Sequence, residues 1–280
     1  MPYIKNIYAR EVLDSRGYPT ISVEVYTQCG ACGSAIVPSG ASSGIYEAME
    51  LRDMQDKRYF GQGVLKAVSH VNKQIALKLC GMCVLDQVNI DRAMMMMDGT
   101  DNKGNLGANA VLGVSIACAQ AAAACLSLPL YRYLGGCFAH TLPIPLINMI
   151  SGGKHCNNGL SFQEFMILPS GASDFKEGVR IGAEIFHQLG EILKLDGYSC
   201  SVSDEGGFAP ALSSNEKALA LVVKAITQAG YQPGKDVTLA LDAAAPQLWV
   251  KGAYHPCDKE NMAMTTEDLL EYYEYLCDKF

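Results

Sequence analysis

Two apolar runs in the second half of the chain, residues 143–150 and 162–168, are separated by only eleven residues. Neighbouring parallel strands need a connection of about a dozen residues or more, which usually contains a helix. The two runs are therefore predicted to form strands that pair antiparallel. This spacing constrains the fold more than any other feature, because it sets the direction of the second strand against the first.

After these runs the apolar spacing becomes that of two helices, a strand and a further helix. The first helix carries one apolar stripe, which consists of Ile181, Ile185, Leu189 and Ile192. The second is predicted to begin at a capping box of Ser213 and Glu216 and to end at Gly230. A buried strand over residues 237–241 and a last helix from Thr266 complete the order β-β-α-α-β-α. A closed (β/α)8 barrel needs eight strands, so either other residues complete it or this half is an open sheet with an unpaired edge.

The first half of the chain has the pattern of a small α+β domain. Ile21, Val23 and Val25 alternate with more polar residues, which is the period of a half-buried strand between two turn clusters. Three helical segments follow, over residues 64–79, 88–97 and 108–126. Strands followed by helices predict an antiparallel sheet with helices. A boundary near Gly135 and Gly136 divides the chain into expected domains of residues 1–136 and 137–280.

Charge and hydropathy narrow the classes of function. The chain is 49% hydrophobic and 18% charged, and its net charge of −7 argues against a nucleic-acid-binding protein. Its first residues lack the apolar segment of a signal peptide. Residues 104–131 carry no charge and are long enough to cross a bilayer, but they are rich in Ala and Gly and contain polar residues. We expect a helix buried on all sides within the domain and no membrane span.

The chain has eleven cysteines. Two C-x-x-C motifs occur, Cys29-Gly30-Ala31-Cys32 and Cys80-Gly81-Met82-Cys83. The gap between them is far longer than in common zinc sites, so a metal or redox role is the less favoured of two interpretations. Cys118 and Cys125 lie in an apolar run, where thiols behave as small core residues. Reduced thiols in a cytoplasmic protein are the preferred interpretation.

Two segments could approach a ligand through small residues. Residues 38–44 form a loop of small side chains, which suits a lid or a close approach of the backbone, although a plain connector is commoner. His155 follows Gly152 and Gly153, and Glu164 lies in the next apolar run. His155 is as readily explained as a surface loop residue. Glu164 is more unusual, because a carboxylate within an apolar strand is costly unless it faces a cleft.

Two acidic positions could hold a metal or transfer protons. Asp204 and Glu205 precede a pair of glycines, an arrangement that suits such a site and equally an acidic turn. Asp242 ends the predicted strand over residues 237–241. Barrel folds place metal ligands at the C-terminal ends of parallel strands, and we expect Asp242 at such an end; capping of the next element is the alternative.

In this order, these segments together resemble the enolase family. The resemblance spans the whole chain and is most specific over residues 38–53. The matching motifs are Asp14-Ser15-Arg16-Gly17-x-Pro19-Thr20, Pro38-Ser39-Gly40-Ala41-Ser42-x-Gly44, Glu47-Ala48-x-Glu50-Leu51-Arg52-Asp53, Leu106-Gly107-Ala108-Asn109-Ala110-x-Leu112-Gly113-Val114-Ser115, Gly152-Gly153-x-His155, Gln163-Glu164-Phe165-Met166, Asp204-Glu205-Gly206-Gly207-x-Ala209-Pro210 and Leu241-Asp242. The family pattern is replaced at Tyr18, Ser203 and Pro246-Gln247, where enolases have Asn, Gly and Ser-Glu.

The resemblance implies Mg²⁺-dependent dehydration of 2-phosphoglycerate to phosphoenolpyruvate in glycolysis, on an incomplete enolase-type barrel. It implies that Glu205 is the acid that assists hydroxide departure, with Glu164 beside it. Asp242 resembles a ligand of the first Mg²⁺ and Ser42 a ligand of the second. The residues expected to contact substrate are His155, Gln163 and Ser42.

The resemblance also implies that part of the active site is absent. In the family, the catalytic lysine, two further ligands of the first Mg²⁺ and the phosphate-binding residues lie on later barrel strands, and this sequence ends at Phe280, where the next strand is expected. Two hypotheses follow. The chain is an enolase completed by sequence not given, such as a separate C-terminal chain, or it is a non-catalytic remnant or interaction module. A homodimer is a further candidate assembly.

Overall fold

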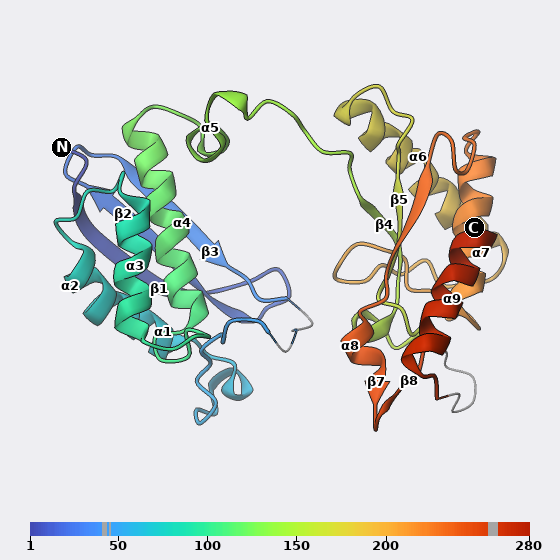
Figure 1. The fold of residues 1–280 in the computed structure, drawn as a ribbon, viewed down its shortest axis with the longest axis horizontal. Helices are drawn as coiled ribbons and strands as arrows, with labels where there is room; N and C mark the ends of the chain where they lie inside the picture. Colours follow the sequence, from blue (N-terminus) through green and yellow to red (C-terminus); the bar gives the residue numbers. More distant parts are fainter. Residues whose placement is uncertain (41–43, 45, 257–262) are drawn as a thin grey trace. The chain divides into compact units, whose positions relative to one another are not determined.

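The computed structural model describes residues 1–40, 44, 46–256 and 263–280. The chain forms two compact units, residues 1–141 and 142–280 (Figure 1). Each unit has its own cluster of buried apolar side chains. The two units are described separately.

Unit 1 is built on a three-stranded antiparallel sheet in the order β1-β2-β3. The strands are β1 (Ile4–Leu13), β2 (Pro19–Thr27) and β3 (Cys32–Val37). The predicted alternation is confirmed, because Ile21, Val23 and Val25 are all fully buried. The turns between strands contain glycines with positive φ, a conformation that side chains rarely adopt.

The helices of unit 1 follow the sheet. They are η1 (Arg58–Gly61), α1 (Leu65–His70), a π-helical turn (Val71–Ile75), α2 (Ala76–Leu79), α3 (Gln87–Asp98), α4 (Ala108–Cys125), α5 (Leu130–Gly135) and η3 (Gly136–Phe138). The helix expected over residues 64–79 is thus a single run with a π-helical turn at its centre. Figure 1 shows α4 lying against the sheet, and it contacts β2, β3 and α3.

Helix α4 is the one helix among the described residues that is long and apolar enough to cross a membrane. In this structure 61% of that segment is buried inside the protein, which is typical of a core helix. The expectation of burial on all sides is too strong, because Leu112 and Ala124 are exposed. A glycine on the sheet lets the helix approach closely, since a Cβ at Gly33 would lie 2.2 Å from the Ala117 carbonyl oxygen.

Unit 2 contains a second three-stranded sheet in the order β4-β5-β6. The strands are β4 (Ile147–Ser151), β5 (Glu164–Leu168) and β6 (Thr238–Asp242). The antiparallel pairing of the first two apolar runs is confirmed. Asp242 is the last residue of β6, as predicted, but β6 pairs antiparallel with β5 and not parallel to it. The physical reason is that β5 runs against both of its neighbours.

Two long helices cover this sheet and a third packs nearby. They are α6 (Phe175–Leu195), α7 (Asn215–Gln228) and α9 (Thr266–Lys279), with the short elements η4 (Gly153–His155), α8 (Ala245–Leu248), β7 (Trp249–Val250) and β8 (Ala253–Tyr254). All four residues of the predicted stripe on α6 are buried. The hairpin β7–β8 and α8 were not expected. No closed barrel is present within the described ranges.

The predicted cap of α7 is displaced by one residue. The N-cap is Ser214, whose hydroxyl accepts a hydrogen bond from the Lys217 backbone N–H at 3.2 Å. The capping box at Ser213 and Glu216 is therefore wrong. Glu216 instead accepts a hydrogen bond from Lys279 on α9 at 2.6 Å, which ties the two helices together.

Candidate active site

The reversed direction of β5 gathers three side chains at one end of the unit 2 sheet. Ser151 at the end of β4 lies opposite Glu164 at the start of β5, and Glu164 lies opposite Asp242 at the end of β6. Directly opposed residues of antiparallel strands place their side chains on the same face. The sheet thus brings Glu164 and Asp242 together, although they are distant in the sequence.

The acidic loop at residues 203–207 is docked onto the end of β4. Inside the loop, the Ser203 N–H donates to the Gly207 carbonyl at 2.8 Å, and the Glu205 N–H donates to the Ser203 hydroxyl at 3.2 Å. The Ser203 and Ser151 hydroxyl oxygens are 2.8 Å apart. A Cβ at Gly207 would lie 2.7 Å from the Ser151 Oγ, so only glycine fits. Sequence reasoning noted Ser203 as a departure from the family but missed that it anchors this loop.

His155 lies in η4, with one nitrogen of its ring close to two carboxylates. Its side chain is 2% exposed, and Nδ1 lies 3.7 Å from Asp204 Oδ1 and 3.8 Å from Glu205 Oε1. Neither ring nitrogen has a hydrogen-bond partner among the described residues. Buried polar atoms without partners are costly, and in a cleft they indicate a group that bonds to a ligand.

The pKa of Glu164 is affected by burial and by the charges of Asp242, Glu205 and His155. Burial raises the pKa of its carboxyl group, the charges of Asp242 and Glu205 raise the pKa further, and His155 opposes them. The structure therefore brings four of the predicted residues together. A carboxyl group with a raised pKa retains its proton at a higher pH than usual, which suits a proton donor.

Gln163 and Asp242 are linked by backbone and side-chain contacts. The Gln163 N–H donates to the Asp242 carbonyl at 2.9 Å, and the Ala244 N–H donates to Asp242 Oδ1 at 2.8 Å. The Gln163 Oε1 accepts a hydrogen bond from the Gln247 side chain at 2.8 Å. Gln247, in α8, is a second departure from the family whose contact could not be predicted, because its partner Gln163 is far away in the sequence.

A polar cavity of about 490 Å³ adjoins His155. Its lining consists of Lys154, His155, Cys156, Asn157, Asn158, Val202, Ser203, Asp204 and Ala209. The side chains include one lysine, one histidine and amides, which are hydrogen-bond donors for an anionic or hydroxylated ligand. The His155 ring therefore lies next to a space that can hold such a ligand.

The predictions for Ser42, for the loop over residues 38–44 and for a metal site do not follow from the contacts described so far. Ser42 lies outside the described residues, and the loop over residues 38–44 belongs to unit 1. Its approach to the site stays a prediction. Among the described residues no group of three or more His, Cys, Asp or Glu side chains could hold a metal ion. Asp242 supplies one carboxylate, and the raised pKa of Glu164 disfavours the anionic form that Mg²⁺ requires. These residues do not fit a Mg²⁺ centre by themselves.

Two family models account for almost all of the sequence. Residues 4–134 match the enolase N-terminal domain, and residues 139–280 match the enolase C-terminal TIM barrel domain. The resemblance carried by the motifs is confirmed. The chain belongs to the enolase family.

Proposed function

We propose that this chain carries the acid half of an enolase-type active site, which when complete dehydrates 2-phosphoglycerate to phosphoenolpyruvate in the cytoplasm. The observation that supports this most is the position of Glu164 opposite Asp242, with a pKa raised by burial and by the charges of Asp242 and Glu205. This end of the sheet can supply a proton to a departing group.

The residues of this chain would act on the departing hydroxide. Hydroxide leaves as water only if an acid protonates it. Glu205, on the loop held by Ser203, is the proposed donor, and the raised pKa of Glu164 favours a protonated carboxyl group near it. His155 and Gln163 are the proposed contacts to substrate. The donor side of the cavity next to His155 suits the anionic groups of 2-phosphoglycerate.

Enolases are generally Mg²⁺-dependent, and Asp242 is the residue here that would contribute a ligand. A dication bound by a single carboxylate keeps most of its water. We therefore propose that a polypeptide of residues 1–280 binds Mg²⁺ weakly. Ser42 is the proposed ligand of a second Mg²⁺.

The test is a phosphoenolpyruvate assay on residues 1–280 with saturating Mg²⁺, alone and mixed with a polypeptide that supplies the later strands of an enolase barrel. We expect no measurable turnover by residues 1–280 alone and turnover in the mixture. In the mixture, Glu205→Gln should lower kcat by about 10²- to 10⁴-fold, the usual contribution of general acid catalysis. Glu191→Gln, on the exposed face of α6, is the matched control. Full activity of the Glu205→Gln mixture would refute the assigned acid.

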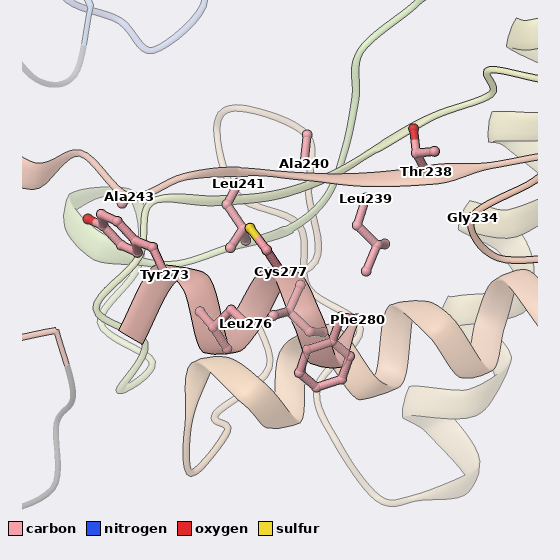
Figure 2. Close-up of a pocket in the computed structure, with 11 residues that line it drawn as sticks. Gly234, Thr238, Leu239, Ala240, Leu241, Ala243, Tyr273, Leu276, Cys277 and Phe280 are labelled. Atoms are coloured by element: carbon pink, nitrogen blue, oxygen red, sulfur yellow. The ribbon is translucent and has the colours of Figure 1, made fainter. Parts of the chain in front are cut away.

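An interaction module is the second candidate, and one observation favours it. A cavity of about 520 Å³ lies between β6 and α9. Figure 2 shows Leu239 and Leu241 pointing from β6 toward Leu276 of α9 and Phe280, which follows this helix. An apolar hollow beside an outer strand suits a partner that adds a strand, such as a complementing C-terminal chain. A homodimer is the other proposed assembly, since enolases often form dimers. Binding of the later-strand polypeptide without turnover would favour the module.

A further inference from the structure

Two cysteines from distant parts of unit 1 are in direct contact. The Sγ atoms of Cys29, in the turn after β2, and Cys125, the last residue of α4, are 3.2 Å apart. A disulfide bond is about 2.05 Å long, so the two sulfurs need to approach by only about 1 Å to form one. Cys29 is exposed and Cys125 is half-buried, so a small oxidant can reach the pair.

The sheet separates the two thiols of the first C-x-x-C motif. Cys32 lies opposite Tyr26 in the register of β2 and β3, and both residues are exposed. Thr27, the next residue along β2, is buried and points to the other face. The Cys29 thiol is on the Thr27 side, 3.2 Å from the Thr27 hydroxyl. The motif therefore does not act as a pair, because Cys125 is the thiol that Cys29 contacts.

Both ends of this contact are held in place. Helix α4 is seated on β3 at Gly33, where a Cβ would meet backbone atoms of the helix at 2.2 Å. The turn is closed by a hydrogen bond from the Thr27 hydroxyl to the Ala31 carbonyl at 2.9 Å. The backbone segments that carry the two cysteines are thus held in place by packing and by a hydrogen bond.

The two thiols also differ in ionisation. Contacts with the Thr27 hydroxyl, the Ala31 backbone and the Cys125 thiol lower the pKa of Cys29 to about 7. Burial and the contact with Cys29 raise the pKa of Cys125. Near neutral pH a large fraction of Cys29 is therefore thiolate, which is the nucleophilic form, while Cys125 is protonated.

We propose that Cys29 and Cys125 form a reversible disulfide that joins the β2–β3 turn to the end of α4. The Cys29 thiolate attacks a low-molecular-weight disulfide such as oxidised glutathione, forms a mixed disulfide and releases one glutathione thiolate. Cys125 then loses its proton to solvent and attacks the Cys29 sulfur, which releases the second glutathione thiolate. Two protein thiols are oxidised and one glutathione disulfide is reduced. Excess reduced glutathione reverses the reaction.

The linkage is tested on the full chain by mass spectrometry after oxidation with excess oxidised glutathione. Trypsin should release peptide 17–52 linked to peptide 104–132. These peptides also contain Cys32 and Cys118, so fragment ions must assign the linked residues. We expect the link in the wild type and in Cys32→Ser, and its loss in Cys29→Ser and Cys125→Ser. A link between Cys29 and Cys32, or glutathione on Cys29 with Cys125 still open to alkylation, would overturn the proposal.

A second measurement, of stability against urea, tests whether the disulfide stabilises unit 1. A disulfide that closes a long loop restricts the unfolded chain, so oxidation should raise the urea midpoint of unfolding. The rise in the urea midpoint should disappear in Cys125→Ala and persist in Cys32→Ser. If Cys125→Ser fails to fold, Cys125→Ala also takes its place in the mass-spectrometric test. An unchanged urea midpoint in oxidised, linked wild type would show that the disulfide does not stabilise the contact between the turn and the helix.

Discussion

The two units each contain a three-stranded antiparallel sheet, and their outer strands differ in burial. Along β3, buried residues alternate with exposed ones, because α4 covers one face and solvent the other. Along β6, all five residues are half-buried, whereas the three central residues of β5 are fully buried. Unit 1 thus covers one face of its outer strand and leaves the other face to solvent, whereas unit 2 leaves every residue of its outer strand partly exposed.

This difference bears on function, because the candidate active site is on the partly covered sheet. Glu164 and Asp242 belong to β5 and β6, and the loop carrying Glu205 docks on β4. The acid groups are assembled by contacts that unit 2 makes by itself. The cavity between β6 and α9 lies beside the outer strand of the same sheet.

The largest expected effect tests the contrast between a central and an outer strand. Ile167 on β5 and Leu239 on β6 lie opposite each other, but Ile167 is fully buried and Leu239 is half-buried. Ile167→Ala should lower the free energy of unfolding by about 2–5 kcal/mol, because it leaves a cavity in packed surroundings. Leu239→Ala should cost about half as much, because less apolar surface is lost from burial. Urea denaturation measures both. Equal losses would show that β6 is as well covered as β5.

The next effect tests the close packing of unit 1. In Gly33→Ala, the added methyl group would lie 2.2 Å from the Ala117 carbonyl oxygen and from the Ala121 nitrogen, so α4 must move away from the sheet. We expect a loss of about 1–3 kcal/mol in unfolding free energy, the usual cost of overpacking. Circular dichroism in urea measures it, with Ser34→Ala at the exposed neighbouring position as the control. A variant as stable as the control would contradict the close approach.

The features predicted correctly from sequence depend on local spacing. The eleven-residue connection gave the antiparallel pairing of β4 and β5, and the period of the apolar residues gave β2 and the stripe on α6. Apolar residues that recur with the period of a helix or a strand indicate which face of that element is buried. The family motifs gave the candidate residues, and the strand register then brings Glu164 beside Asp242.

The features that were missed depend on contacts between distant segments or on a single backbone angle. The direction of β6 depends on which strand it joins, and the sequence does not encode strand order locally. The contacts of Gln247 with Gln163 and of Cys29 with Cys125 each join segments far apart in the chain. Ser213 and Ser214 are chemically identical as caps, and only the turn entering α7 selects Ser214.

A smaller effect tests this cap, which begins one of the helices covering unit 2. Ser214→Ala removes the acceptor for the Lys217 N–H and should cost about 1 kcal/mol in unfolding free energy. Ser213→Ala is a matched control, because it deletes the same hydroxyl from the neighbouring residue and should leave the stability nearly unchanged. Thermal unfolding of the two variants side by side measures the difference. The reverse order of stability would restore the capping box at Ser213.

The smallest expected effect concerns the pH dependence of unit 2, because solvent screens the charge of the half-buried Glu164. The pKa of this carboxyl group is raised from its ordinary value of 4.5, first by burial and then by the charges of Asp242 and Glu205. The folded state therefore binds the proton more tightly than the unfolded state does. The resulting stabilisation is complete below the ordinary pKa and is lost as the pH rises through the folded value.

Glu164→Gln isolates this contribution, because glutamine stays neutral at every pH. Wild type should lose stability relative to Glu164→Gln as the pH rises above 4.5. Urea unfolding of both proteins at pH values above 4.5 measures the difference between their free energies of unfolding. Taking this difference cancels most of the pH dependence that comes from the titratable groups common to both proteins. Glu191→Gln, at an exposed position of α6, should give a difference that does not change with pH. A flat difference for Glu164→Gln as well would mean that the carboxyl group is solvated like a surface residue. That result would remove the raised pKa of Glu164 as support for its proposed part in proton transfer.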